Sequence, residues 1–303
     1  MLKKLSIWLL LVLAFILLAG CHSPALEGEI NDDLGRPINI SKIPQRIVSL
    51  SPSNTEILFA LGLADKVVGV TNFCDYPPQA KGKEKVGGFA NPDIEKIIIL
   101  SPDLVLVTGV HQNLIPKLAG RGLTVVALAP KTLDDVLKGI SLVGKITGTD
   151  KEASRLVGDM RNRIDKVVNK TENLPQDEKP RVFYLTWHGP LWTVGSGTLE
   201  DELIQKAGGI SIADDAQGHY VVDFELVLER NPQVIIASTG HGQAEDLPYK
   251  WVKTEPRLKS TEARKSDRIY RIDADLITRP GPRIIEGLEC LACFIHPDVP
   301  LPK

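Results

Sequence analysis

The chain has 303 residues, 43% of them hydrophobic, and a formal net charge of −2 at pH 7. This length allows one large or two medium-sized globular domains with cores of their own. No basic stripe accompanies the near-neutral charge, so the sequence lacks the usual signature of a nucleic-acid-binding protein.

Residues 1–20 are predicted to form a lipoprotein signal peptide. Lys3 and Lys4 precede an apolar run that ends in Leu-Ala-Gly before Cys21. This ending resembles a bacterial lipobox, in which the cysteine is diacylated and becomes the mature N-terminus. The alternative, an ordinary membrane anchor, is less favoured because a spanning helix needs about 20 apolar residues. We therefore expect an extracytoplasmic chain that is held on the periplasmic face or the cell surface through lipidated Cys21.

The other cysteines do not predict a disulfide scaffold. Cys74, Cys290 and Cys293 follow Cys21, and an odd number leaves at least one free thiol or an intermolecular pair. A chain of this length can build a hydrophobic core without disulfides.

Residues 21–45 are expected to form a tether and a small hairpin around Leu34-Gly35, and residues 46–148 an N-terminal lobe. Ser53 with Glu56 predicts a capping box at the start of one helix, and Thr132 or Asp134 the start of another. Between the helical segments lie apolar runs that are typical of parallel strands buried on both faces, at 46–50, 67–71, 103–109 and 123–128. This alternation predicts a parallel sheet with helices on both faces.

Residues 149–172 are predicted to form one long connecting helix of about 20 residues, spanning ~30 Å. The segment is charged and contains no proline, and a proline-containing stretch at 172–180 ends it. Its apolar residues share one helical face: Ala153, Leu156, Val157, Met160, Ile164, Val167 and Val168.

Residues 180–303 predict a second lobe, with strands at 181–187, 191–195, 233–238 and 268–273. A repeat supports two related lobes, because several residues recur 130 positions later: Asp93 as Asp223, Glu95 as Glu225, Pro102 as Pro232 and Val105 as Ile235. The predicted fold is therefore α/β, with two Rossmann-like lobes, each a parallel sheet flanked by helices, joined by one long α-helix.

Motifs for catalysis or a resident metal are weak. Residues 139–146 miss a P-loop by one position, because Ile146 replaces the required hydroxyl residue, and they continue a helical period. Gly195–Gly197 lacks the spacing of a dinucleotide loop or a serine-hydrolase elbow. Cys290, Cys293 and His296 share one helix face, but packing as small apolar surface is favoured over a metal site. We expect neither an enzyme nor a bound cofactor.

The aromatic side chains point to ligand binding instead. Strand interiors consist of Val, Ile and Leu, whereas eight aromatic residues are expected in loops or at strand ends: Phe73, Tyr76, Phe89, Trp187, Trp192, Tyr220, Tyr249 and Trp251. Ligands of open α/β sheets bind beyond the carboxyl ends of the strands, where rigid aromatic rings provide apolar contact area. The alternative, that a ring covers the core of its own lobe, is expected for about half of them.

Polar groups are expected near the same rim. Asp275 and Arg279 are candidate anchors for a ligand. His188, His219 and His241 also lie in predicted loops, where a surface role is favoured, although they leave a metal-centred ligand open.

Three stretches, at 44–80, 86–106 and 279–289, make the chain similar to the substrate-binding proteins of ABC importers for cobalamin, haem and ferric siderophores. The similarity extends from about Pro44 to His296. It implies two Rossmann-like lobes joined by one long helix, limited hinge motion on ligand binding, and no catalytic activity.

Within this family the loop pattern is most similar to that of cobalamin-binding members. The resemblance assigns ligand contacts to Pro52, Phe73, Phe89, Asp275 and Arg279, and Tyr76 is a further loop aromatic that we include. Trp187 matches an aromatic position after a shift of one residue, and His219, with Tyr220 beside it, replaces a tryptophan. Ala207 replaces a cysteine of the family's disulfide. Because of these departures, Cys74 and His219 leave another corrinoid or a haem as alternatives.

Glu95 and Glu225 match the two carboxylates, one in each lobe, that bind arginine pockets of the permease in this family. A bidentate Arg–carboxylate pair provides orientation as well as attraction. The alternative for each residue is a solvated side chain in a helix's first turn, favoured by the helix dipole.

The sequence therefore predicts a monomeric, lipid-anchored protein that captures a corrinoid and delivers it to an ABC permease dimer with its ATPase subunits. The alternatives are the same role for haem or a ferric siderophore, or an enzyme or metallocluster protein on this scaffold. The small number of cysteines disfavours the last of these, although fold alone does not exclude it.

Overall fold

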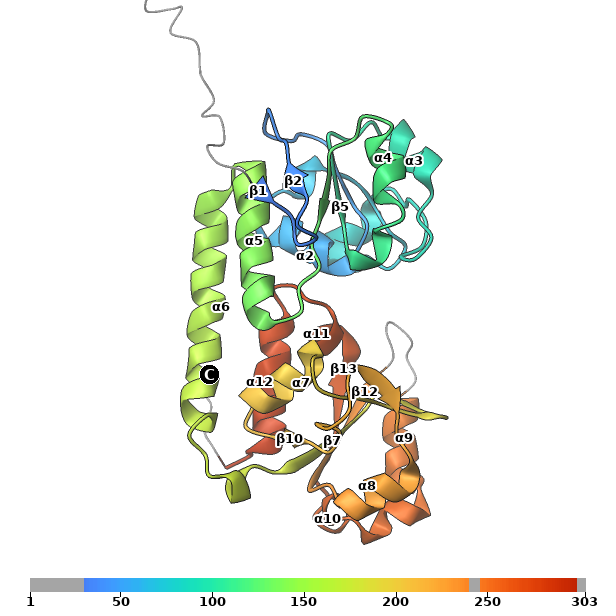
Figure 1. Cartoon of the computed structure of the whole chain (residues 1–303), viewed down its shortest axis with the longest axis vertical. Coiled ribbons are helices and arrows are strands. Elements are labelled where there is room, and N and C mark those ends of the chain that lie inside the picture. Colours follow the sequence, from blue (N-terminus) through green and yellow to red (C-terminus); the bar gives the residue numbers. More distant parts are fainter. Residues whose placement is uncertain (1–29, 240–245, 299–303) are drawn as a thin grey trace, which may run out of the picture.

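The computed structural model describes residues 30–239 and 246–298, which form two α/β lobes beside one long helix (Figure 1). This helix, α6 (Asp150–Thr171), runs along one side of both lobes. The fold class predicted from the sequence is thereby confirmed. The predicted signal peptide, Cys21 and His241 lie outside the described residues.

A small hairpin precedes the first lobe. Strands β1 (Ile30–Asn31) and β2 (Pro37–Ile38) pair antiparallel around a turn in which Gly35 has a positive φ of 73°. The Asp32 carboxylate accepts a hydrogen bond of 3.1 Å from the Ala127 amide. The hairpin is therefore tied to the central sheet of the first lobe.

The N-terminal lobe is built on a four-stranded parallel sheet with the spatial order β4-β3-β5-β6. Its strands are β3 (Ile47–Ser49), β4 (Val67–Val70), β5 (Leu104–Val107) and β6 (Val125–Ala127). Four α-helices belong to it, namely α2 (Pro52–Ala60), α3 (Ile94–Ile99), α4 (Ile115–Ala119) and α5 (Leu133–Thr147), with short 3₁₀ turns η1 (Ala64–Lys66), η2 (Pro78–Gly82) and η3 (Gly109–His111). All four residues of β5 are buried, as expected for a strand covered on both faces.

The C-terminal lobe repeats this topology. Its parallel sheet has the order β10-β7-β12-β13, with β7 (Arg181–Leu185), β10 (Ile210–Ser211), β12 (Val234–Thr239) and β13 (Ile269–Asp273). If the parallel strands of each lobe are numbered along the chain, their order across the sheet is second, first, third, fourth in both lobes. The repeat at offset 130 corresponds to α3 and β5 in one lobe and to α8 (Phe224–Arg230) and β12 in the other.

Further elements complete the C-terminal lobe. A three-stranded antiparallel sheet, in the order β11-β9-β8, consists of β8 (Trp187–His188), β9 (Leu191–Val194) and β11 (His219–Val221). The remaining helices are α7 (Leu199–Lys206), α9 (Leu247–Thr254), α10 (Glu262–Lys265), α11 (Ala274–Thr278) and α12 (Ile284–Ile295), with 3₁₀ turns η4 (Gln176–Glu178) and η5 (Pro256–Ser260).

Helix α6 packs closely against both lobes. A Cβ added at Gly144 of α5 would lie 2.4 Å from the Ala153 Cβ of α6, so the two helix backbones approach closely. At the other lobe, the Arg163 guanidinium of α6 donates two hydrogen bonds of 2.8 and 2.6 Å to the Glu289 carboxylate of α12. These contacts favour a stiff connection over a flexible hinge.

Two local predictions need correction. The capping box of Ser53 and Glu56 is wrong: α2 begins at Pro52, and the Ser51 hydroxyl caps it by accepting from the Asn54 amide. The Glu56 side chain is buried instead of reaching back to the helix start. On α12, Cys290 packs against the core, but Cys293 is exposed, so the prediction of core packing holds only for the former.

Other local predictions hold. Thr132 is the residue that caps α5, by accepting from the Asp135 amide, and residues 139–146 lie inside this helix. None of the described helices combines the length and apolarity needed to span a bilayer.

Candidate functional site

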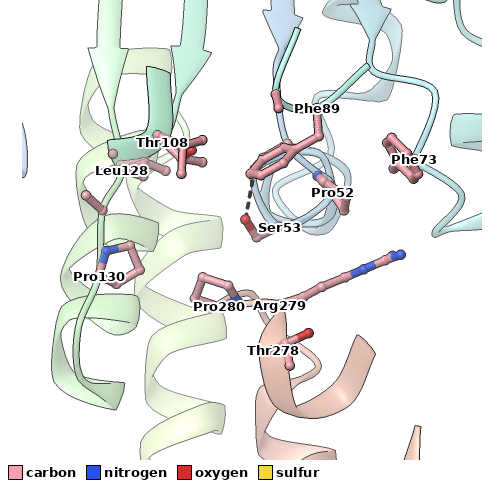
Figure 2. Close-up of a pocket in the computed structure, with 15 residues that line it drawn as sticks. Pro52, Ser53, Phe73, Phe89, Thr108, Leu128, Pro130, Thr278, Arg279 and Pro280 are labelled. Atoms are coloured by element: carbon pink, nitrogen blue, oxygen red, sulfur yellow. Dashed lines mark hydrogen bonds between the residues drawn. The ribbon is translucent and has the colours of Figure 1, made fainter. Parts of the chain in front are cut away.

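A cavity of about 720 Å³ lies between the lobes, beyond the carboxyl ends of the N-terminal lobe's strands (Figure 2). The chain leaves β3, β5 and β6 at this edge, which is where ligands of parallel sheets bind. The C-terminal lobe contributes Thr278, the last residue of α11, with Arg279 and Pro280 after it, and these approach from the opposite side. The cavity is therefore formed by both lobes.

The walls of the cavity are mainly apolar. Phe73 and Val110 are 56% and 66% exposed, and Phe89, Leu128 and Pro130 line the same space. Large apolar side chains with this exposure mark a binding surface in a soluble protein.

Arg279 is the one charged residue among the fifteen that line the cavity, and it is already paired. Its Nη2 lies 2.8 Å from the Asp275 carboxylate, one turn earlier, and its Nη1 lies 2.7 Å from Asp75 and 3.5 Å from Glu56. Burial of Asp75 opposes ionisation, but the Arg279 hydrogen bond prevails and lowers the pKa of that carboxyl. Among the described residues that line it, the cavity thus presents no unpaired cation.

A second ion pair joins the lobes behind Arg279. Arg283 donates from Nε and Nη2 to the Glu56 carboxylate at 2.9 and 2.6 Å. Its guanidinium carbon lies 3.8 Å from the centroid of the Tyr76 ring. Burial raises the pKa of Glu56, and Arg283 and Arg279 oppose that effect. Tyr76, predicted as a ligand contact, therefore packs on Arg283 and does not line the cavity.

The C-terminal lobe exposes an aromatic face on its antiparallel sheet. Cross-strand pairing sets Trp187 opposite Trp192 and Trp192 opposite Val221, and these side chains are 42%, 38% and 46% exposed. Alternation along β11 brings His219 to the same face as Val221 and turns Tyr220 toward the lobe's core. The Tyr220 ring accordingly packs against the core cluster of this lobe, away from the cavity.

Of Cys74 and His219, the two side chains that left another corrinoid or a haem as alternatives, only His219 is accessible. Its Nε2 lies 3.8 Å from the Glu200 carboxylate, and its side chain is 55% exposed. The Cys74 thiol is buried, with its sulfur 3.2 Å from the hydroxyls of both Thr55 and Thr71. No three His, Cys, Asp or Glu side chains gather as metal ligands within residues 30–239 and 246–298.

Glu95 and Glu225 occupy equivalent places in the two lobes. Each is the second residue of its helix, Glu95 in α3 and Glu225 in α8. The N-cap of each helix is an aspartate, Asp93 or Asp223. Both glutamates are exposed. Glu225 interacts electrostatically with Arg257 of η5, which is itself paired with Glu255. Their exposure leaves both carboxylates accessible to a partner.

Comparison with known proteins identifies the family. The family described as periplasmic binding protein matches residues 47–276, which is more than half of the chain. The chain belongs to this family. It is the substrate-binding component of an ABC transporter and not an enzyme.

Named relatives of this periplasmic binding protein differ in ligand. It is 35% identical to the uncharacterized ABC transporter substrate-binding lipoprotein YvrC of Bacillus subtilis, over 98% of each chain. It is 30% identical to the Vitamin B12-binding protein of Vibrio cholerae, over 83% of this chain and 89% of the relative. A solved structure of a possible iron-binding (periplasmic solute-binding) protein from Staphylococcus epidermidis has a TM-score of 0.72 and 31% identity, covering 84% of this chain and 100% of that one.

The structure brings together only part of the residue set inferred from the sequence. Pro52, Phe73, Phe89 and Arg279 line the cavity, and Asp275 is paired with Arg279. Trp187 and His219 lie on the aromatic face of the other lobe. Sequence reasoning missed several contributors, namely Glu56, Asp75, Thr108, Val110, His111, Val221 and Arg283. The position of Thr108 and Val110 directly after an apolar strand is a signal that could have found those two.

Proposed function

We propose that this periplasmic binding protein captures a corrinoid, cobalamin, between its lobes and delivers it to the permease of an ABC importer. The observation that carries this proposal is a largely apolar interlobe cavity whose single guanidinium, on Arg279, is paired with Asp275 and Asp75. Such a site suits a large ligand that offers apolar area and neutral hydrogen-bonding groups.

A corrin ring bordered by amide groups has this chemistry. Its apolar faces would pack against Phe73, Phe89 and Pro52, while amides at its edge would bond Asp275 and Arg279. The aromatic face with Trp187, Trp192 and His219 would provide the second wall from the other lobe. The corrinoid is cargo, so capture and release need no covalent step and no resident cofactor.

A ferric chelate is the second candidate, because one relative is named as possibly iron-binding. The carboxylates of haem or of many siderophores would require a free cation, and Asp75 would have to leave Arg279 to provide one. The side chain of Asp75 is 40% exposed, so it can move away into solvent. This route costs an ion pair, which is why the corrinoid is favoured.

For delivery, we propose that Glu95 and Glu225 bind arginine pockets on the permease dimer, which carries its ATPase subunits. Two exposed carboxylates in the first turns of equivalent helices support this role. Each would form a charge-assisted pair, and the two together would orient a monomer over the channel entrance. Cys21, once lipidated, would hold the protein on the outer side of the membrane.

Calorimetric titration of the purified protein with cyanocobalamin, haemin and a ferric siderophore tests the ligand. We expect tight binding of cyanocobalamin and a roughly tenfold or greater loss of affinity in Phe89→Ala, because a buried aromatic contact is lost. Ile99→Ala is the matched control, since Ile99 is 77% exposed on α3 and does not line the cavity. Binding of haemin or the siderophore without binding of cyanocobalamin would overturn the assignment.

A further inference from the structure

His111 connects two walls of the cavity. The residue is 2% exposed and ends the 3₁₀ turn η3. Its Nδ1 lies 3.1 Å from both the amide nitrogen and the hydroxyl oxygen of Thr108, and its Nε2 lies 2.7 Å from the carbonyl oxygen of Phe89. Both Thr108 and Phe89 line the cavity. Thr108 comes directly after β5, whereas Phe89 lies in the loop between η2 and α3.

The two backbone partners fix the protonation of the imidazole. The Thr108 amide can only donate, so Nδ1 must be an unprotonated acceptor. The Phe89 carbonyl can only accept, so Nε2 must carry the proton. A neutral ring satisfies both bonds in a single tautomer.

The segment that carries Phe89 has few other restraints. A bridge between Gly87 and Pro92 closes its base, and the Asp93 amide donates to the Val86 carbonyl at 2.7 Å. At the tip, Phe89 and Ala90 make no backbone–backbone hydrogen bond with another described residue. The imidazole also packs edge-on against the Phe89 ring, with a centroid distance of 5.3 Å.

We propose that His111 is a positioning residue that holds the Phe89 wall of the ligand cavity in place through its Nε2–H. Its Nδ1 bond to Thr108 has a different task, which is to close the η3 turn. The inference relies on the proposed function only in that the ligand occupies this cavity.

Two substitutions separate these tasks. In His111→Gln, the side-chain amide nitrogen can reach the place of Nε2 and donate to Phe89, while the acceptor for Thr108 is lost. In His111→Asn, the shorter side chain can place its oxygen near Nδ1 and accept from Thr108, but it does not reach Phe89. His111→Asn loses the bond to Phe89, and His111→Gln loses the contacts with Thr108, so a decrease in global stability is expected in both variants.

Hydrogen exchange of the ligand-free protein gives a test that needs no ligand. The Asp93 amide, whose hydrogen bond to Val86 closes the base of the Phe89 segment, should exchange on the order of tenfold faster in His111→Asn than in the wild type, and close to the wild-type rate in His111→Gln. Equal exchange in this segment for all three proteins would overturn the proposal.

Titration with cyanocobalamin adds the functional readout. Affinity should fall about tenfold in His111→Asn and be largely retained in His111→Gln. If both variants bind like the wild type, Phe89 does not depend on His111, and the proposal fails. If the wild type itself does not bind cyanocobalamin, the proposed ligand fails, and the exchange result still decides the role of His111.

Discussion

Replacing Arg283 with methionine is expected to destabilise the protein strongly, because it leaves a buried carboxylate without its main partner. The Glu56 side chain is 2% exposed and that of Arg283 14%, with a closest N–O distance of 2.6 Å. Methionine retains an unbranched apolar stem but lacks the guanidinium that lies over the Tyr76 ring. The substitution therefore removes the charge, its two hydrogen bonds to Glu56 and the contact with Tyr76.

The structure sets the size of the effect. Removing one partner of a buried ion pair costs about 3–5 kcal/mol. Two features place Arg283→Met near the lower limit: Arg279 stays 3.5 Å from Glu56, and the pKa of Glu56, which burial already raises, allows the carboxylate to bind a proton. We expect a loss of about 3 kcal/mol, which corresponds to a decrease in Tm of roughly 6–12 °C for a chain of this size.

A double-mutant cycle of Glu56→Gln and Arg283→Met, followed by thermal unfolding, measures the interaction. The double variant should be more stable than the sum of the single effects predicts, by at least about 1 kcal/mol. Arg163→Met is the control, because its pair with Glu289 is 38% and 34% exposed and should contribute less than about 1 kcal/mol.

The pH dependence gives a second check. Because the pKa of Glu56 is raised in the folded state, that state binds the proton more tightly, and the Arg283→Met variant should regain stability as the pH falls from 7.5 toward 5.5. Additive single effects, or a Tm for Arg283→Met within 2 °C of the control variant, would refute the view that this pair holds the lobes together.

Three further predictions follow from other parts of the molecule. Burial lowers the pKa of His111 in the folded state, so the contribution of its neutral ring to stability is complete above the unfolded-state pKa near 6.5 and decreases at lower pH. The Tm of the wild type should therefore fall more between pH 7 and 5 than the Tm of His111→Gln. Parallel curves of Tm against pH for the two proteins would contradict this. The double substitution Glu95→Ala with Glu225→Ala should abolish ligand uptake by cells while leaving calorimetric affinity within about twofold, whereas a large affinity loss would place these residues in the ligand site. Gly144→Val should lower the free energy of unfolding, measured with denaturant, by about 1–3 kcal/mol, because the added side chain meets Ala153. Gly158→Ala, on the exposed side of α6, should raise it by up to about 1 kcal/mol. Equal effects of the two substitutions would contradict the close contact between α5 and α6.

Much of the fold could be predicted because it depends on local patterns. Continuous Val, Ile and Leu runs indicated the parallel strands, and the apolar face from Ala153 to Val168 indicated the connecting helix. The repeat at offset 130 indicated two related lobes, and the structure places both copies as the helix and third strand of equivalent sheets.

The candidate site could be predicted only in part. Pro52 and Phe73 come three residues after β3 and β4 end, so their location at the carboxyl edge results from chain direction, whereas Phe89 lies in the longer loop between η2 and α3. Tyr220 could not be placed, because the face on which it lies depends on how β11 pairs with β9. His111 gave no signal, because its partners are two backbone groups that only the folded loops bring together.

The helix that carries Glu56 was predictable from local sequence, whereas the partner of the Glu56 side chain depended on the tertiary structure. The sequence determined that a helix lies there, since helix propensity and periodicity are local. It could not determine whether the carboxylate caps its own helix or binds Arg283, which is 227 positions away. That choice depends on the packing of two lobes against one stiff helix, because a buried carboxylate pairs with whichever cation the fold brings to it.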